Sequence, residues 1–137
     1  WDDKMKGTVD TLSIAVDAQD NLLVVSQEFG KVYVLKEDNN QYCVVHIFGD
    51  SILGPNRNLK RPVGIATDCR YDYIYIIECD RLCMFSSEGE CLACFDKVGE
   101  ESIPFRNLSG ISVTKEGSVI LADGGSLMEV DTLHRDV

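Results

Sequence analysis

The sequence predicts an all-β protein, a β-propeller of four-stranded antiparallel blades with about three blades present. One motif occurs three times, with its isoleucines at Ile14, Ile65 and Ile111. The copies lie about 50 residues apart, a period at which repeats indicate propeller blades. Each copy also contains short apolar runs bounded by Gly, Asn, Asp or Ser. No stretch shows sustained helical periodicity, so strands are expected throughout.

The recurring motif is the predicted first strand of each blade. Its three versions read SIAVD, GIATD and GISVT, at residues 13–17, 64–68 and 110–114. Two further apolar runs follow each version after short polar turns, of which Gly124–Gly125 predicts a tight hairpin. The predicted second strands are residues 22–26, 74–78 and 119–123. The predicted third strands are residues 31–35, 81–85 and 126–130.

A fourth strand is predicted only in the first two copies, at residues 42–48 and 91–95. The third copy ends after its third strand. We therefore divide the single domain, residues 1–137, into three blades. They are blade 1 at about residues 9–50, blade 2 at about residues 59–97 and an incomplete blade 3 at about residues 105–131.

Three blades leave the two ends of the array open. Propellers usually close with four to eight blades, and open apolar flanks need a cover in water. The chain is therefore either part of a longer propeller or half of a six-bladed ring completed by a second copy. Closure within the chain, with residues 5–9 as a missing fourth strand, is a third possibility.

The composition is that of a soluble domain. The chain has 137 residues, of which 45% are hydrophobic and 26% charged, enough for one core. No apolar run approaches the roughly 20 residues of a membrane-spanning helix. Because the chain does not begin with Met, we expect it to be a piece of something longer. The formal net charge of −10 disfavours nucleic acid, although a local basic patch can override that field.

Six cysteines raise the question of disulfides or a metal site. They are Cys43, Cys69, Cys79, Cys83, Cys91 and Cys94. Cys91 and Cys94 form a CxxC pair, but residues three apart in a strand point to opposite faces. We therefore expect no metal and no cofactor here. Small thiols packed in a core explain the set better and predict a reducing compartment, the cytoplasm, with the disulfide state left open.

The sequence favours a protein without catalysis. It has no Gly-x-Ser-x-Gly elbow, and neither His46 nor His134 adjoins a plausible nucleophile. Asp17 and Asp68 recur at the end of the first strand, as a ring of metal-binding carboxylates would, but the third copy has Thr114 there. We therefore expect the two aspartates to cap turns through the backbone.

Long connectors join successive copies, and in a propeller they share one face with the loops between second and third strands. Such loops carry binding on a rigid scaffold. Basic side chains and one aromatic gather there: Arg57, Lys60, Arg61, Arg81, Phe105 and Arg106. Acidic side chains in the same loops neutralise this patch: Asp50, Asp80, Asp96, Glu100 and Glu101. Because stacking aromatics are scarce there, we favour a protein ligand over RNA.

The second copy resembles the NHL repeat. Residues 59–68 (LKRPVGIATD), 73–78 (YIYIIE) and 81–85 (RLCMF) follow that family's Pro-x-Gly-Ile-Ala-x-Asp strand, its apolar strand with an acidic or polar end and its Arg-hydrophobic-x-x-Phe strand. The first copy lacks the Pro and Gly, and the third has Thr114 in place of the Asp. The resemblance covers nearly the whole chain. It implies a six-bladed ring, of the kind that selects substrates at the C-terminus of tripartite-motif ubiquitin ligases or, in other members, binds RNA.

The resulting hypothesis is a non-catalytic module for protein–protein interaction or substrate recognition, with its ligand at the connector face. The sequence holds no cysteine–histidine zinc module, so ligase activity would come from another part of the protein. An RNA-binding propeller is the first alternative, and a propeller enzyme of the lyase or lactonase type is the second and less favoured. The expected partners are a protein ligand and a second copy that completes the ring, and no membrane.

Overall fold

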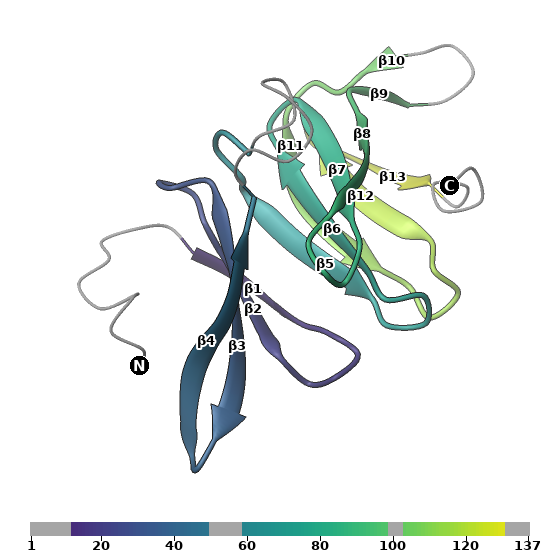
Figure 1. The fold of residues 1–137 in the computed structure, drawn as a ribbon. Coiled ribbons are helices and arrows are strands. Elements are labelled where there is room, and N and C mark those ends of the chain that lie inside the picture. Colours follow the sequence, from purple (N-terminus) through teal and green to yellow (C-terminus); the bar gives the residue numbers. More distant parts are fainter. Residues whose placement is uncertain (1–11, 50–58, 99–102, 131–137) are drawn as a thin grey trace.

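The computed structural model describes residues 12–49, 59–98 and 103–130, and these ranges are all-β (Figure 1). Three antiparallel sheets of three or four strands follow one another along the chain, each with its strands in sequence order. Blade 1 contains β1 (Leu12–Val16), β2 (Leu22–Ser26), β3 (Lys31–Asp38) and β4 (Gln41–Phe48). Blade 2 contains β5 (Gly64–Asp68), β6 (Tyr73–Glu78), β7 (Arg81–Phe85) and β8 (Cys91–Phe95). Blade 3 contains β11 (Leu108–Val113), β12 (Val119–Asp123) and β13 (Ser126–Val130), and the predicted fold class is confirmed.

Two hairpins show how the local sequence sets the turns. Gly124 and Gly125 have φ of 57° and 87°, so the turn between β12 and β13 uses the left-handed backbone of a tight two-residue hairpin, as predicted. Asn39 and Asn40, with φ of 52° and 65°, form the same kind of turn between β3 and β4. Asparagine tolerates this conformation better than most residues, which lets β3 run longer than the sequence predicts.

A small hairpin in the second connector was not predicted. It pairs β9 (Lys97–Val98) with β10 (Ile103–Pro104). Strands of two residues are too short to show a hydrophobic period, so sequence patterns miss them. The hairpin extends the end of β8 on the side where the chain passes to blade 3 (Figure 1).

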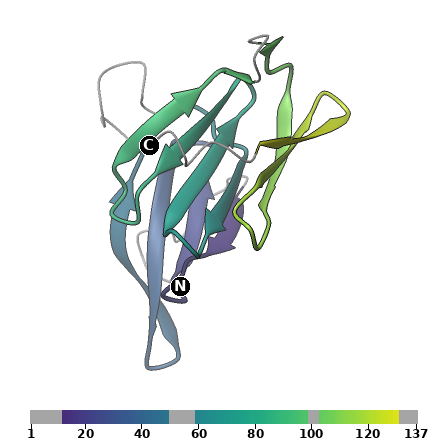
Figure 2. The ribbon, with the colours of Figure 1, turned by 90° about the vertical axis from the view of Figure 1, so that its right-hand side faces the viewer.

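The blades pack face to face, because alternate residues of every strand point to opposite sides of its sheet. Figure 2 shows the three sheets side by side. The core between blades 1 and 2 includes Leu23, Val25, Val32, Phe48, Ile65, Ile76 and Phe85. The core between blades 2 and 3 includes Tyr75, Ile77, Leu82, Met84, Leu108, Val119 and Leu121.

The first strands of the blades lie together. β5 contacts β1 on one side and β11 on the other. Gly64 of the recurring motif permits this approach, because a Cβ there would lie 3.1 Å from the Ile77 side chain and 3.4 Å from Ile111. First strands that converge on one axis are the arrangement of a propeller.

Blade 2 is covered on both faces, whereas β1 of blade 1 and β13 of blade 3 carry exposed apolar side chains. Ile14 and Val16 of β1 are 63% and 51% exposed, and Leu127 of β13 is 79% exposed. Ile14 occupies the position at which Ile65 packs on blade 1 and Ile111 packs on blade 2. The face of blade 1 that carries Ile14 therefore corresponds to the face by which blades 2 and 3 pack on the preceding blade. In blade 1 this face is exposed at Ile14 and Val16, whereas Val24 and Leu35 on it are buried. Within the described ranges, no helix has the length and apolarity to cross a bilayer.

Candidate functional site

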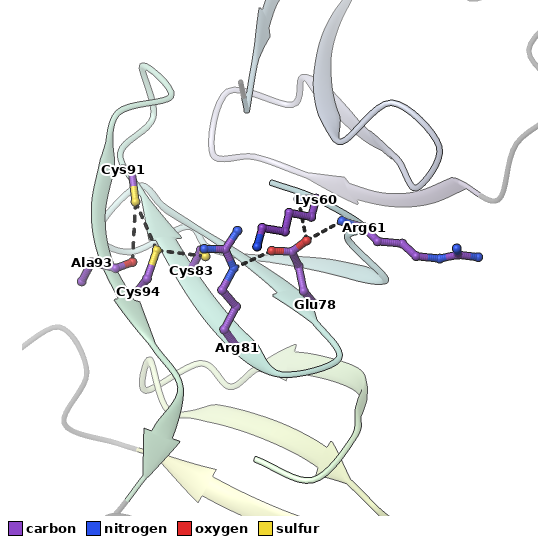
Figure 3. A network of polar contacts seen from close by, with 8 residues as sticks. All are labelled: Lys60, Arg61, Glu78, Arg81, Cys83, Cys91, Ala93 and Cys94. Carbon is purple, nitrogen blue, oxygen red and sulfur yellow. Dashed lines mark hydrogen bonds and ion pairs between the residues drawn. The ribbon is translucent and has the colours of Figure 1, made fainter. Parts of the chain in front are cut away.

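A buried carboxylate at the end of β6 holds the connector that leads into blade 2. Glu78 Oε1 accepts hydrogen bonds from the backbone N–H groups of Lys60, at 2.7 Å, and Arg61, at 2.5 Å (Figure 3). Glu78 is only 4% exposed. Two residues further on, the Val63 N–H donates to the carbonyl of Ile77 at 2.8 Å. The acidic end of the second strand therefore fixes the path of the connector onto the blade.

The second oxygen of Glu78 holds Arg81, the first residue of β7. Arg81 Nε donates to Glu78 Oε2 at 2.5 Å, and the two side chains are 13% and 5% exposed. Burial lowers the pKa of the Arg81 guanidinium, while Cys83 and then the hydrogen bond and charge of Glu78 raise it. The net pKa lies above its ordinary value. Arg81 is therefore a fixed cation in the wall of the site.

The connector into blade 3 is held in the same way. Asp123, at the end of β12, is 3% exposed. Its Oδ1 accepts hydrogen bonds from the N–H groups of Arg106, at 2.8 Å, and Asn107, at 2.5 Å. Glu78 and Asp123 thus occupy matching places in successive blades, and Lys60 and Arg106 are matching residues of the two connectors.

A cavity opens beside the Glu78–Arg81 pair, on the connector face of blade 2. Its volume is about 480 Å³. It is lined by Lys60, Arg61, Glu78, Cys79, Asp80, Arg81 and Asp96. In Figure 3 the Arg61 side chain extends away from the ion pair. Three cationic and three anionic side chains therefore line one cavity, and Glu78 and Arg81 among them form a short ion pair.

The predicted binding residues lie in different places in the structure. Lys60, Arg61 and Arg81 meet in this cavity. Arg106 is exposed in the next connector, where its guanidinium lies 3.4 Å from Ser126 Oγ, and it does not line the cavity. Arg57 lies outside the described residues.

Phe105 requires a correction. It was expected among the binding residues of the connector face, but it is 8% exposed and packs in the core between blades 2 and 3. The Phe105 N–H donates to the carbonyl of Asp96 at 3.2 Å, which draws the residue inward beside the β9–β10 hairpin. Phe105 therefore shapes the connector and offers no ring surface to a ligand.

The thiol arrangement also corrects the sequence analysis. Cys91 and Cys94 were expected on opposite faces of β8, yet their sulfur atoms lie 3.5 Å apart, and Cys94 Sγ lies 3.0 Å from Cys83 Sγ (Figure 3). The reason is a bulge in β8: Phe85 pairs with Cys91 and Met84 with Ala93, which leaves Leu92 as the extra residue. The described residues contain no cluster of His, Cys, Asp or Glu arranged to hold a metal ion.

The residues at the ends of the first strands cap turns, as predicted. Asp17 Oδ1 accepts the N–H groups of Gln19, at 2.9 Å, and Asn21, at 2.8 Å. Asp68 Oδ1 accepts the N–H of Arg70 at 3.0 Å. In blade 3 the hydroxyl oxygen of Thr114 accepts a hydrogen bond from the N–H of Ser118 at 3.1 Å, so a neutral residue caps the corresponding turn.

A second cavity, of about 630 Å³, lies between blades 1 and 2 at the opposite ends of the strands. It is lined by Asp17, Gln19, Asn21, Val34, Val45, His46, Asp72, Ser87 and Glu88. His46 Nε2 lies 3.0 Å from the carbonyl oxygen of Glu88. Sequence analysis did not predict this cavity, because its walls come from strands and turns of two blades, and no local sequence pattern shows how the two blades lie relative to each other.

Comparison with solved structures places this fold in a class. The chain is similar to dihydro-heme d1 dehydrogenase NirN in complex with DHE, with a TM-score of 0.62 and 11% identity over 87% of this chain and 25% of that one. It is also similar to the hydrazine synthase of Kuenenia stuttgartiensis, with a TM-score of 0.64 and 17% identity over 93% of this chain and 36% of that one. Both are proteins of the β-propeller type, and identities this low show the fold alone.

The chain is thus a segment of β-propeller fold that spans about a quarter to a third of the length of these two similar chains. No protein-family model and no curated protein matches the sequence.

Proposed function

We propose that this propeller segment is a non-catalytic module that binds a protein partner through the cavity around Glu78. The observation that carries the proposal is the mixed charge of the cavity wall. Glu78 and Arg81 neutralise each other, and Lys60 and Arg61 then share the wall with Asp80 and Asp96. A peptide segment with side chains of both signs complements such a wall, and complementary charges give specificity.

The same wall disfavours RNA. A nucleic-acid backbone carries only negative charge. The acidic side chains of the cavity wall, which can bind cationic groups of a peptide, therefore repel phosphate. The whole chain adds a formal net charge of −10. The aromatic candidate for base stacking, Phe105, is buried. A protein ligand therefore fits the face better than single-stranded RNA does.

The wider assignment follows from the NHL resemblance of blade 2. We propose that the segment serves substrate recognition of the NHL type, in the ubiquitin pathway. The contacts of Glu78 support this reading, since they give a physical role to the acidic end of the second strand and to the Arg that opens the third, both of which belong to the NHL pattern.

The absence of catalysis is part of the proposal. The carboxylates at the strand ends are engaged with backbone N–H groups, as in Glu78, Asp123 and Asp17. His46 lies against the carbonyl of Glu88 at 3.0 Å. These groups serve the fold, which supports a binding function over an enzymatic one.

A selection of random short peptides against the chain tests the proposal. We expect enriched peptides to bind the wild-type chain and to lose at least about tenfold in affinity, ~1.4 kcal/mol, when Lys60→Glu and Arg61→Glu are combined. The matched control combines Lys36→Glu and Lys115→Glu, which makes the same charge change at exposed positions outside the cavity. Equal affinity in both variants would refute the cavity as the binding site. Tight, steeply salt-dependent binding of a single-stranded oligouridine would instead favour RNA.

A second copy of the chain is the further partner we propose. Ile14 and Val16 are exposed on the face of blade 1 that corresponds to the packing face of blade 2, so a blade of the same kind can cover these two side chains. Light scattering at several concentrations is expected to give twice the 15.2 kDa of the chain. A monomer at every concentration would contradict the dimer. The expectation that all six thiols pack in a core is wrong for Cys43, Cys69 and Cys79, which are exposed. Exposed free thiols are typical of a reducing location, and we propose the cytoplasm.

A further inference from the structure

We propose that Cys83, Cys91 and Cys94 form an oxidation site, in which Cys94 makes a disulfide with Cys83 and Cys91 can take the place of Cys83. The three thiols lie in a row with Cys94 in the middle (Figure 3). Its Sγ is 3.0 Å from that of Cys83 and 3.5 Å from that of Cys91. None of the three lines the cavity around Glu78, and the proposed binding function does not use them.

The backbone already suits a bond between Cys83 and Cys94. The two residues are direct partners in the register of β7 and β8. Direct partners in an antiparallel pair have Cα atoms about 4.5 to 5.5 Å apart. Disulfides form at Cα separations of about 4.4 to 6.8 Å, with the sulfur atoms about 2.05 Å apart. The bond therefore needs side-chain rotation rather than a movement of strands.

The bulge at Leu92 supplies the third thiol. Without it, Cys91 would point to the other side of β8, whereas in the structure Cys91 Sγ contacts Cys94 Sγ. Cys83 is fully buried and Cys91 is 4% exposed, while Cys94 is half-buried. Cys94 is therefore the thiol that a dissolved oxidant reaches first, with a resolving thiol on either side.

The reaction balances with a small-molecule disulfide, such as oxidised glutathione, as the oxidant. Cys94 loses its proton to water, and its thiolate attacks one sulfur of that disulfide. One glutathione thiolate leaves, and Cys94 carries a mixed disulfide. Cys83 loses its proton in turn, attacks the Cys94 sulfur and displaces the second glutathione. Two protein thiols are oxidised by two electrons, and one glutathione disulfide is reduced to two thiols.

The surroundings of Cys94 set the rate of this reaction. The hydrogen bond with Cys83 is the main cause that raises the pKa of the Cys94 thiol above its ordinary value, and burial adds to it. The hydrogen bond with Cys91 and the charge of Arg81 act in the opposite direction, and the net shift is upward. Because the thiolate is the attacking species, oxidation is slow at neutral pH and accelerates as the pH rises.

The experiment uses the chain with Cys43→Ser, Cys69→Ser and Cys79→Ser, which removes the three exposed thiols. This chain is incubated with oxidised glutathione and analysed by intact mass and peptide mapping. We expect the loss of two hydrogen atoms, a Cys83–Cys94 link and full reversal by a reductant. Added Cys91→Ser leaves the link intact, added Cys83→Ser moves it to Cys91–Cys94, and added Cys94→Ser abolishes it. The rate is expected to rise about tenfold or more between about pH 7 and about pH 9, as the thiolate fraction grows.

Three results would overturn the site. They are an intramolecular disulfide that persists with Cys94→Ser, a stable glutathione adduct on Cys94 that Cys83 and Cys91 never resolve, and a rate that is flat with pH. Near-ultraviolet circular dichroism checks that each variant is folded. Should Cys83→Ser fail to fold, Cys83→Ala replaces it at this fully buried position, and Cys94→Ser at its half-buried position remains the decisive variant.

Discussion

The connectors into blades 2 and 3 meet the same requirement with different side chains. Each brings two backbone N–H groups against the end of a second strand, where a buried carboxylate accepts them. In Glu78 one carboxylate oxygen accepts both N–H groups, and the other oxygen accepts a hydrogen bond from Arg81. Asp123 is one methylene shorter, and its second oxygen lies 3.1 Å from the Arg106 N–H. The third strand of blade 3 begins with Ser126 in the place of Arg81.

The difference shows how one repeat acquires a site on a shared scaffold. In both blades the carboxylate is structural, because buried N–H groups need acceptors. In blade 2 the longer side chain also draws a cation into the face, and a charged cavity of about 480 Å³ surrounds the pair. Blade 3 has the anchor without that cation. The carboxylate anchor is therefore shared by blades 2 and 3, whereas the cavity lies at blade 2.

The largest effect is expected from Glu78→Ala. This change leaves the Lys60 and Arg61 N–H groups without their acceptor and removes the carboxylate that pairs with Arg81. Breaking a buried pair by removing one partner is strongly destabilising, and we expect a loss of about 3 kcal/mol in the free energy of unfolding. Urea denaturation measures it. Glu37→Ala, at an exposed position on β3, is the control and should change stability by less than about 0.5 kcal/mol.

Asp123→Ala is expected to cost less, about 2 kcal/mol, because it leaves two N–H groups unpaired but no ion-paired cation. The same urea experiment gives the comparison with Glu78→Ala. If Asp123→Ala proved the more damaging of the two, the ion pair with Arg81 would add nothing to the anchor, and the distinction between the two connectors would fail.

Replacing the anchor residues of blade 2 by those found at the same positions in blade 3 sharpens the comparison. Glu78→Asp and Arg81→Ser are measured singly and together. Because the two side chains are in direct contact, the double variant should lose about 1 kcal/mol less than the sum of the single losses. Strict additivity would show that Glu78 and Arg81 act independently.

The smallest effect on stability is expected from charge reversal at the exposed connector residues. Lys60→Glu and Arg106→Glu leave the backbone N–H groups in place, so each should change the free energy of unfolding by less than about 0.5 kcal/mol. The two differ in binding, since Lys60 lines the cavity and Arg106 does not. Peptide titration should show weaker binding for Lys60→Glu alone, and an equal loss for Arg106→Glu would extend the site to blade 3.

The strands could be read from the sequence because they depend on local patterns. The first, second and third strands of all three blades, the fourth strands of two and the Gly124–Gly125 turn follow from alternation and turn residues. The acidic ends of the second strands in blades 2 and 3 were visible in the sequence. Their role was not, because Glu78 is 17 and 18 residues away from its backbone partners.

The features that sequence analysis missed arise from tertiary contacts and irregular backbone. The bulge at Leu92 leaves no local pattern, yet it brings Cys91 to the side of Cys94. Phe105 was expected to contact a ligand because it lies in a polar connector. It is buried because it packs against residues of blades 2 and 3. A periodicity argument assumes a regular strand, so it fails where one extra residue changes the face.

The central claim is that the connector anchored by Glu78 forms the binding face. Amide chemical-shift mapping of the labelled chain with a selected peptide tests it most directly. We expect the largest shifts at Lys60, Arg61 and Asp96, around the cavity on blade 2. Shifts confined to Asn21, His46 and Asp72 would place the ligand in the second cavity, between blades 1 and 2, and would contradict the account.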